Sequence, residues 1–417
     1  MNKLEIKEFD KKVDFIYKII SSIILLFIVE YKRFKYYFNS VLIICFTCFV
    51  LYNKFKYRNL IELRTFKKYV RDCKKAINYN INKISKKKPY VTICIPALNM
   101  EKYIKKNLLS IINQSFQDFA ITIVDDKSTD KTGNIIKKLQ INDERIKVIS
   151  HSKNLGLYHS RIESILNSNS EYIILMDPDD MYMNENLFKQ LYNSNLKKNF
   201  DIIEFSVFQQ NENSNKIYYP DNDFENHYHK FSKDIIYQPE LSEILFYLPG
   251  TNIVSKTICR TIWNKIIRRE ILIKTYNYIG KDYYDDYVIT ADDMLMNIIS
   301  YQFANNYTNS FLPGYLYTIR KVSMSRGNGG DILTQARSIN YFLYIEIFYK
   351  YVKEYNKNRD FLFFEMKDLN YYILNIKKCY PKYLLKEINL IEALIEDKFI
   401  SDEFKDYLMN LLIYLKK

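Results

Sequence analysis

The sequence predicts an α/β protein built on a Rossmann-like, mostly parallel sheet, with apolar helices before the sheet and a helical extension after it. Three observations support this class. Short apolar, β-branched runs alternate with helical patterns between residues 90 and 195. Acidic and other polar residues follow the ends of these runs. Two long apolar stretches lie in residues 1–52, and residues 332–417 carry an amphipathic helical pattern.

The alternating region defines the expected sheet. The apolar runs predict strands at 90–96, 119–124, 146–150 and 171–176. The patterns between them predict helices at 103–114, about 128–139, 158–167 and 184–195. Strands and helices that alternate at this spacing form a doubly wound sheet, in which ligands bind at the carboxyl ends of the strands. Residues 209–230 are polar and predict a long loop.

Length, charge and cysteine content restrict the class of protein. A chain of 417 residues, of which 48% are hydrophobic, is long enough for two or three structural regions. The formal net charge is +14, and in residues 54–88 the only acids are Glu62 and Asp72. This basic run follows an apolar stretch, so we expect it to attract anionic membrane lipids; no zinc-finger spacing or RNA-recognition signature predicts nucleic acid as a partner. The six cysteines are scattered, which indicates reduced thiols.

The apolar stretches predict a membrane-associated region at 1–57. Residues 36–52 approach the length of a short transmembrane helix, with Asn39 as the one costly residue, whereas residues 15–31 are marginal because they include Lys18 and Glu30. The basic residues that follow place the rest of the chain in the cytoplasm. One span and a shallow re-entrant pair both remain open. Residues 58–88 form a basic amphipathic connector, and residues 326–417 form a helical C-terminal region.

An acidic turn follows the fourth predicted strand. It reads Asp-Pro-Asp-Asp at 177–180, so three carboxylates lie within four residues. Carboxylates that crowd together repel each other, and Mg²⁺ or Mn²⁺ commonly offsets this by binding carboxylate and phosphate oxygens. Taken alone, the turn is equally compatible with a solvated cap of the following helix.

Further polar motifs follow the other strands in a fixed order. They read Pro-Ala-Leu-Asn-Met-Glu at 96–101, Asp-Asp-Lys-Ser-Thr-Asp at 125–130, and Asn-Leu-Gly at 154–156 with Arg161 downstream. Later come Trp-Asn-Lys-Ile-Ile-Arg at 263–268, Ala-Asp-Asp at 291–293 and Tyr-Thr-Ile-Arg-Lys-Val-Ser-Met-Ser at 317–325. This ordered set resembles glycosyltransferase family 2, whose members share the GT-A fold and bind nucleotide-sugars. The likeness covers residues 89–325, which we therefore expect to be a GT-A domain.

The resemblance implies roles for individual residues. The implied nucleotide-sugar site comprises Pro96, Ala97, Asn99, Glu101, Asp125, Asp126, Arg161, Asp177 and Arg320. Within it, Asp126 would hydrogen-bond the base, Asp177 would lie near the ribose and the metal, and Arg320 would contact the diphosphate. The implied metal ligands for Mn²⁺ or Mg²⁺ are Asp179, Asp177 and Asp180, with Asp179 as the direct ligand and Asp180 as a substitute or neighbouring partner.

Asp293 is the general base that the resemblance implies. It would take the proton of an acceptor hydroxyl as the oxygen attacks the anomeric carbon and inverts it. Asp292 is the alternative base, and a carboxylate that merely favours the helix dipole is the structural alternative for Asp293. Lys127 departs from the family pattern, because it replaces the usual glycine after the aspartate pair, so the turn there is expected to differ.

The expected activity is transfer of a sugar from a nucleotide donor, first of all a uridine diphosphate sugar, to a glycan or lipid-linked acceptor. A nucleotidyltransferase would share the metal and nucleotide but usually carries a Gly-rich loop after the first strand, which residues 96–99 lack. A non-catalytic, membrane-bound interaction protein on a degenerate GT-A fold is the third class, and the intact aspartates argue against it. The sugar, the acceptor and the linkage have no readable motif.

Overall fold

The computed structural model divides the chain into two units, residues 1–87 and 88–417. It describes residues 88–194, 198–214, 216–218, 235–238, 241, 261–280, 283, 287–320, 331–355, 357, 362, 366 and 381–416. The predicted membrane region and nearly all of the predicted connector lie outside these residues, as do residues 321–325 of the last motif. Within the described residues, no helix is both long and apolar enough to cross a membrane.

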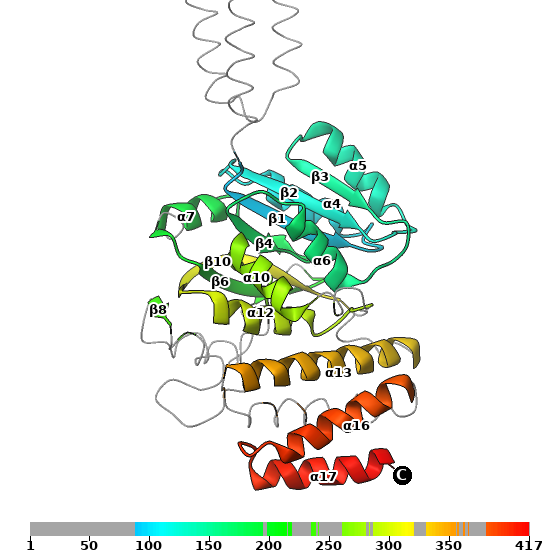
Figure 1. Cartoon of the computed structure of the whole chain (residues 1–417). Helices are drawn as coiled ribbons and strands as arrows, with labels where there is room; N and C mark the ends of the chain where they lie inside the picture. The colour runs from blue at the N-terminus through cyan, green and yellow to red at the C-terminus, as the bar shows by residue number, and fades with distance from the viewer. Residues whose placement is uncertain are drawn as a thin grey trace, which may run out of the picture. The chain divides into compact units, whose positions relative to one another are not determined.

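The N-terminal half of the second unit is a parallel α/β layer (Figure 1). Its strands are β1 (Val91–Ala97), β2 (Phe119–Asp125), β3 (Ile146–Ser150) and β4 (Tyr172–Leu175), in the spatial order β3-β2-β1-β4. Its helices are α4 (Ile104–Ile112), α5 (Thr132–Asn142), α6 (Leu157–Leu166) and α7 (Leu187–Ser194). All four predicted strands are present within one residue of their expected ends.

Burial on both faces explains why β1 could be predicted from its sequence. In β1, Ile93 and Ile95 pack in a cluster with residues of α4 and α5, whereas Cys94 packs in a second cluster with residues of α6. All seven residues of β1 are buried, so the strand needs a continuous apolar sequence. The paired registers bring Ala97 of β1 opposite Asp125 of β2, and both strands therefore end at the same edge.

The second half of the sheet corrects the expectation of a mostly parallel arrangement. It adds β5 (Met181–Tyr182), β6 (Ile202–Asn211), β7 (Ile217–Tyr218), β8 (Ile235–Tyr237), β9 (Lys265–Arg268) and β10 (Asn306–Ile319). Strand β9 enters between β4 and β6 and is antiparallel to both, while β10 is parallel to β6 and antiparallel to β5 and β8. The sheet is therefore mixed. Strand β6 also reaches into the predicted loop at 209–230, most of which lies outside the described residues.

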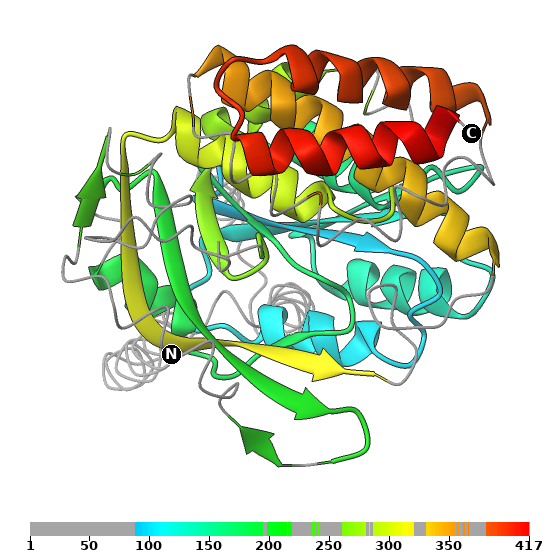
Figure 2. The same ribbon diagram turned by 90° about the horizontal axis from the view of Figure 1, so that it is seen from below.

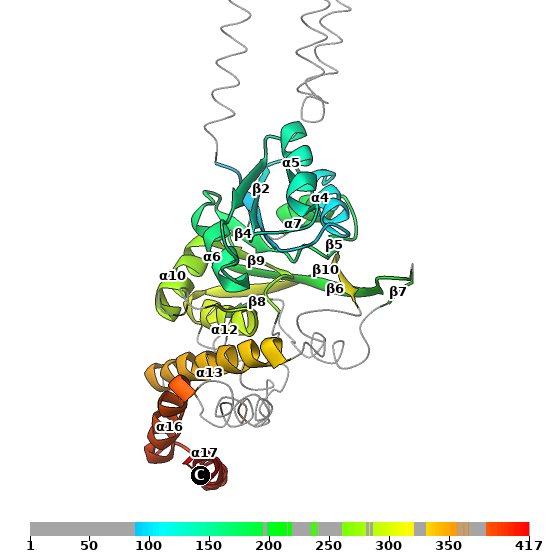
Figure 3. The ribbon, with the colours of Figure 1, turned by 90° about the vertical axis from the view of Figure 1, so that its right-hand side faces the viewer.

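Helices cover the second half and continue into the C-terminal region (Figures 1 and 3). They are α10 (Arg269–Ile279), α12 (Asp292–Phe303), α13 (Asp331–Glu354), α16 (Pro381–Glu396) and α17 (Asp402–Lys416). Figure 2 shows α16 and α17, coloured orange-red and red, side by side. Apolar residues of all five helices belong to one buried cluster, so the C-terminal helices are packed onto the α10–α12 layer. This packing fixes the amino end of α12 at the edge of the sheet where β1, β2 and β4 end.

Candidate functional site

A cavity of about 450 Å³ opens at the carboxyl ends of β1, β2 and β4. Its wall also takes residues from the amino ends of α6 and α12 and from β6 and β10. The predicted site residues on the wall are Pro96, Ala97, Asp126, Arg161, Asp177, Asp179, Asp292, Asp293 and Arg320. Segments far apart in the sequence thus meet at the sheet edge that the strand-end rule predicted.

Three other predicted binding residues do not line the cavity: Asn99 and Glu101 connect the loop after β1 to the loop after β2, and Asp125 bonds within the loop after β2. The Asn99 side chain accepts a hydrogen bond from the Thr129 backbone N–H at 2.8 Å. The Glu101 carboxylate accepts one from the Lys131 N–H at 3.0 Å. Asp125 accepts one from the Ser128 N–H at 3.0 Å. These hydrogen bonds give Asn99, Glu101 and Asp125 a role in the structure of the two loops.

Asp180 also points away from the cavity. It is fully buried, and its two oxygens accept hydrogen bonds from the Tyr315 hydroxyl and the Thr318 backbone N–H, both at 2.7 Å. Burial, followed by the charges of Asp179 and Asp177, raises the pKa of Asp180 well above its usual value. Both oxygens are bonded to β10, and Asp180 does not line the cavity.

Arg161 is the central cation of the site. Its Nη2 lies 2.7 Å from Asp177 Oδ1, and its Nη1 lies 2.5 Å from Asp292 Oδ2. Arg161 and Asp292 are both buried, so the ion pair between them is shielded from water, whereas the side chain of Asp177 is 26% exposed. Burial disfavours the guanidinium charge, but the two carboxylates outweigh it and raise the pKa of Arg161. The arginine therefore joins α6, the acidic turn and the amino end of α12.

Asp293 also lies on the cavity wall, next in sequence to the ion-paired Asp292. One of its oxygens accepts a hydrogen bond from the Met294 N–H at 2.9 Å, in the first turn of α12. Burial and then the neighbouring charge of Asp292 raise the pKa of Asp293 to about 7, against the lowering effect of Arg161. Ala291, just before the helix, has φ of 62°. A left-handed alanine costs about 1–2 kcal/mol, which the packing around the turn must offset.

Asp179 pairs with Arg320 across the mouth of the acidic turn. The Arg320 Nε lies 2.6 Å from Asp179 Oδ2, and the guanidinium carbon lies 5.3 Å from the centre of the Tyr103 ring. Burial and the charge of Asp177 raise the pKa of Asp179 to about 6 in spite of this arginine. Burial and a neighbouring negative charge both disfavour the ionised form of a carboxylate.

The Asp126 carboxylate is held firmly. It accepts hydrogen bonds from the Leu155 N–H at 2.8 Å and the Gly156 N–H at 2.9 Å, and it lies 2.7 Å from His151 Nδ1. A carboxylate offers about four acceptor positions, so one remains for a ring N–H of a nucleotide base. Gly156 has φ of +96°, and a Cβ there would lie 2.9 Å from the Val288 carbonyl oxygen. The glycine of the Asn-Leu-Gly motif therefore permits the contact that orients Asp126.

Aromatic residues also line the cavity, and the sequence did not predict their role. The Trp263 ring stacks on Tyr315 and Tyr317, with centroid distances of 4.4 and 5.5 Å. Trp263 and Tyr317 line the cavity, as does Tyr287. Trp263 is the only tryptophan of the chain and could have drawn attention to this part of the cavity, but no sequence spacing connects it with β10.

The oxygen atoms of the cavity fit a hard divalent cation. Among the described residues of the wall, five carry carboxyl groups, Asp126, Asp177, Asp179, Asp292 and Asp293, and two are arginines, Arg161 and Arg320. Asp177 and Asp179 lie on one turn, and a carboxylate pair is the ligand type that Mg²⁺ and Mn²⁺ prefer. Burial and the charge of Asp177 disfavour the ionised Asp179 carboxylate, and a bound cation would offset both effects.

Comparison with known proteins identifies a family for this part of the chain. Residues 92–274 match the sequence model described as glycosyl transferase family 2. The chain contains a glycosyltransferase family 2 domain. The glycosyltransferase GlyA of Streptococcus pneumoniae is 27% identical over 238 residues, which cover 57% of this chain and 31% of that protein. The cholesterol galactosyltransferase of Borreliella burgdorferi is 25% identical over 330 residues, which cover 78% of this chain and 83% of that protein.

Solved structures support the same fold for the family 2 domain. The crystal structure of Staphylococcus aureus TarS residues 1–349 with UDP-GlcNAc aligns with a TM-score of 0.51 and 20% identity, over 78% of this chain and 87% of that one. The likeness shows a GT-A-like fold. Among the curated relatives, the chain spans less than half the length of GlyA and of several others that it matches.

Proposed function

We propose that the protein is a metal-dependent, inverting glycosyltransferase that uses a nucleotide-sugar. The observation that carries the proposal is the meeting, in one cavity, of the acidic turn at Asp177 and Asp179 with the amino end of α12 at Asp293. Arg161 links the two elements by direct ion pairs to Asp177 and Asp292. A donor held at the acidic turn would thus place its sugar near Asp293, where an acceptor hydroxyl could lose its proton to this base.

Asp126 is the proposed contact for the nucleotide base. Asp126 lines the cavity together with Pro96 and Ala97, which would form the apolar floor of the nucleoside pocket. A base with a ring N–H suits this acceptor, which favours uracil. The UDP-GlcNAc complex of TarS, a structure of similar fold, supports a uridine diphosphate sugar as the donor to test first.

The proposed residues for Mn²⁺ or Mg²⁺ are Asp177 and Asp179. When bound, the ion would neutralise the charge that develops on the departing nucleoside diphosphate. Arg320 has a related task, because its guanidinium lies 2.6 Å from Asp179 at the rim of the cavity. Release from this ion pair would allow Arg320 to contact the diphosphate instead, and Arg161 would keep Asp177 in position.

Asp293 is the proposed general base. A base with a pKa near 7 is half ionised at neutral pH and is a stronger proton acceptor than an ordinary aspartate. The acceptor oxygen would attack the anomeric carbon as the proton moves to Asp293, the bond to the diphosphate would break, and the configuration would invert. Asp292 is held by Arg161 at 2.5 Å, so it is the less suitable base of the pair.

The proposed acceptor is a hydroxyl of a glycan or lipid-linked molecule. Trp263 and Tyr317 on the cavity wall offer flat apolar surfaces for a sugar ring or a lipid. The similarity to a protein named cholesterol galactosyltransferase supports a lipid acceptor.

We further propose that residues 1–57 attach the enzyme to the cytoplasmic face of a membrane. Deletion of residues 1–54 should then release a soluble protein, and its continued presence in the membrane pellet would contradict a simple anchor.

A panel of nucleotide-sugars, each incubated with the protein and Mn²⁺, tests the activity by the release of nucleoside diphosphate. The Asp179→Asn variant should lose metal-dependent release and retain its circular dichroism spectrum. Glu185→Gln is the matched control, since it removes an exposed acid near the same turn that does not line the cavity. Equal turnover of Asp179→Asn and the wild type would rule out the proposed metal site, and no release with any donor would refute the proposed function.

A further inference from the structure

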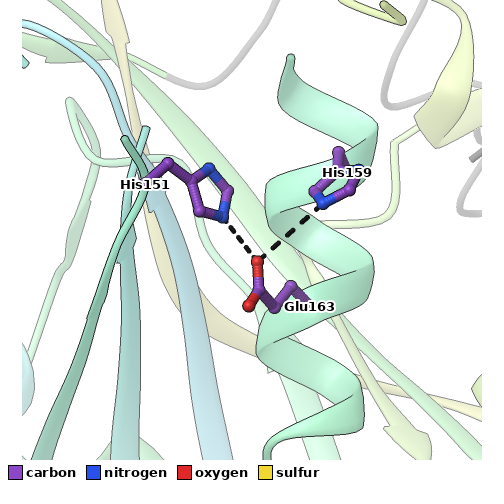
Figure 4. Close-up of side chains that lie close together, drawn as sticks. All are labelled: His151, His159 and Glu163. Atoms are coloured by element: carbon purple, nitrogen blue, oxygen red, sulfur yellow. Dashed lines mark hydrogen bonds and ion pairs between the residues drawn. The ribbon is translucent and has the colours of Figure 1, made fainter. Parts of the chain in front are cut away.

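Two histidines and a glutamate gather between β3 and α6 (Figure 4), and one of them, His151, lies 2.7 Å from Asp126. His151 directly follows β3, and His159 and Glu163 are one turn apart on α6. The Glu163 Oε2 lies 2.5 Å from His151 Nε2 and 3.9 Å from His159 Nε2. The two imidazole rings are nearly perpendicular, with centroids 5.5 Å apart. One ligand atom from each residue lies within 4.8 Å of the other two.

The hydrogen bonds of His151 require a cation. Both of its ring nitrogens face carboxylate oxygens: Nδ1 faces Asp126 at 2.7 Å, and Nε2 faces Glu163. A neutral imidazole carries one N–H, so it can donate to only one of these acceptors. The second contact would then bring an unprotonated nitrogen against an anionic oxygen in a largely buried place. Either a second proton or a metal ion must supply the missing positive charge.

We propose that His151 Nε2, His159 Nε2 and the Glu163 carboxylate form a transition-metal site, with Zn²⁺ as the ion that fits best. Two imidazoles and one carboxylate are a set that Zn²⁺ binds at about 2.0–2.2 Å, with a fourth position left for water. The mixed nitrogen and oxygen set is chemically different from the all-oxygen turn at Asp177 and Asp179, which suits Mg²⁺ or Mn²⁺.

Asp126 would complete this site from behind. A histidine that binds metal through one nitrogen usually donates its other N–H to a carboxylate, which fixes the tautomer and the ring direction. His151 already has this arrangement, since Nδ1 faces Asp126 while Nε2 faces the cluster. The N–H groups of Leu155 and Gly156 hold the same carboxylate. The metal site and the nucleotide cavity would therefore share Asp126 without sharing a ligand atom.

The geometry of the three residues also suits a change from proton to metal. His159 and Glu163 are related by an i, i+4 spacing, so both side chains leave the same face of α6. Their side chains are 16% and 26% exposed, which leaves access for the ion, while that of His151 is 6% exposed. Movement of the His159 ring toward Glu163 would bring the three donors around one ion without a change in the backbone.

Metal titration of the untagged full-length protein tests the proposal. Zn²⁺ is added in competition with a chromophoric chelator, in excess Mg²⁺ so that the aspartate site is occupied. We expect one Zn²⁺ per chain in the wild type and an affinity at least about tenfold lower in His159→Ala and in Glu163→Gln. The double variant His227→Ala/His229→Ala removes the remaining histidines of the chain and should bind as the wild type does.

Co²⁺ substitution distinguishes this site from a cysteine site. Binding by imidazole and carboxylate gives visible absorption bands without the near-ultraviolet band of a cobalt thiolate, and the visible bands should disappear in His159→Ala. Equal Zn²⁺ affinity in the wild type, His159→Ala and Glu163→Gln would overturn the proposal and leave a doubly protonated His151 as the explanation. Loss of binding in the His227→Ala/His229→Ala variant, or a thiolate band, would place the metal elsewhere and also overturn it.

Discussion

The acidic limb of the pH profile is the sharpest test of the base. Burial and Asp292 raise the pKa of Asp293 from 3.8 to about 7, so at pH 6 only about one tenth of the carboxyl groups are ionised. We expect kcat/KM to fall about tenfold per pH unit below pH 7. An aspartate at its ordinary pKa would give a flat profile down to about pH 5. The Asp293→Asn variant should lose about 10²–10⁴-fold in rate, which corresponds to about 3–5 kcal/mol of transition-state stabilisation.

The assay measures transfer and diphosphate release between about pH 5 and pH 9, with nucleotide affinity by calorimetry at each pH. Asp402→Asn is the control, because Asp402 is also a first-turn aspartate, on α17, and does not line the cavity. If Asp293 only favours its helix dipole, both variants should lose similar stability and neither should lose turnover. A flat profile between about pH 5 and pH 7, or loss of nucleotide binding in Asp293→Asn, would refute the assignment.

The same pKa has a consequence for stability. A carboxyl group whose pKa is higher in the folded than in the unfolded state binds its proton more tightly in the folded state. The contribution of Asp293 to stability is thus complete below about pH 4 and is lost as the pH rises toward about 7. In the metal-free protein, Asp293→Asn should raise the midpoint of urea unfolding at pH 8, and this gain should vanish near pH 4.

Three further substitutions have definite expected outcomes. Arg161→Met leaves two carboxylates unpaired, one of them buried, and should lower the free energy of unfolding by about 3–5 kcal/mol in urea titrations; an unchanged midpoint would contradict the two ion pairs. Lys127→Gly relieves a left-handed residue with φ of 67° and should stabilise by up to about 1 kcal/mol after the entropy of glycine is subtracted, whereas a loss of stability would argue against that conformation. Gly156→Ala should destabilise by at least about 1 kcal/mol and weaken nucleotide binding, because its Cβ would collide with Val288; normal affinity would show that Asp126 does not depend on this turn.

The parallel half of the sheet could be predicted because burial gives most of its strands a recognisable apolar sequence. Strands buried on both faces need nearly uninterrupted apolar residues, and β1, β2 and β4 show them, whereas the edge strand β3 includes the exposed Lys147. The other half was not predictable, since its strands contain polar residues that only the tertiary structure pairs. Lys265 of β9 and Glu204 of β6 are fully buried and lie 3.3 Å apart. In β10, register irregularities around Pro313 interrupt the pattern further.

Part of the site was likewise accessible from the sequence. The strand-end rule brings Asp126 and Asp177 to one edge, and both line the cavity. The rule places backbones but gives no direction for individual side chains in a turn, so it could not separate Asp179, on the cavity wall, from Asp180, which bonds to β10. Nor does any spacing connect His151 with α6, because their approach depends on how the helix packs against the sheet.

The charge of the cavity indicates how the donor must bind. Five carboxyl groups face two arginines on its wall, and one of these, Arg161, is already committed to Asp177 and Asp292. A nucleotide-sugar would add the negative charges of its diphosphate to this surface, which without a cation is a repulsive encounter in a partly buried place. Metal and donor should therefore each raise the affinity for the other.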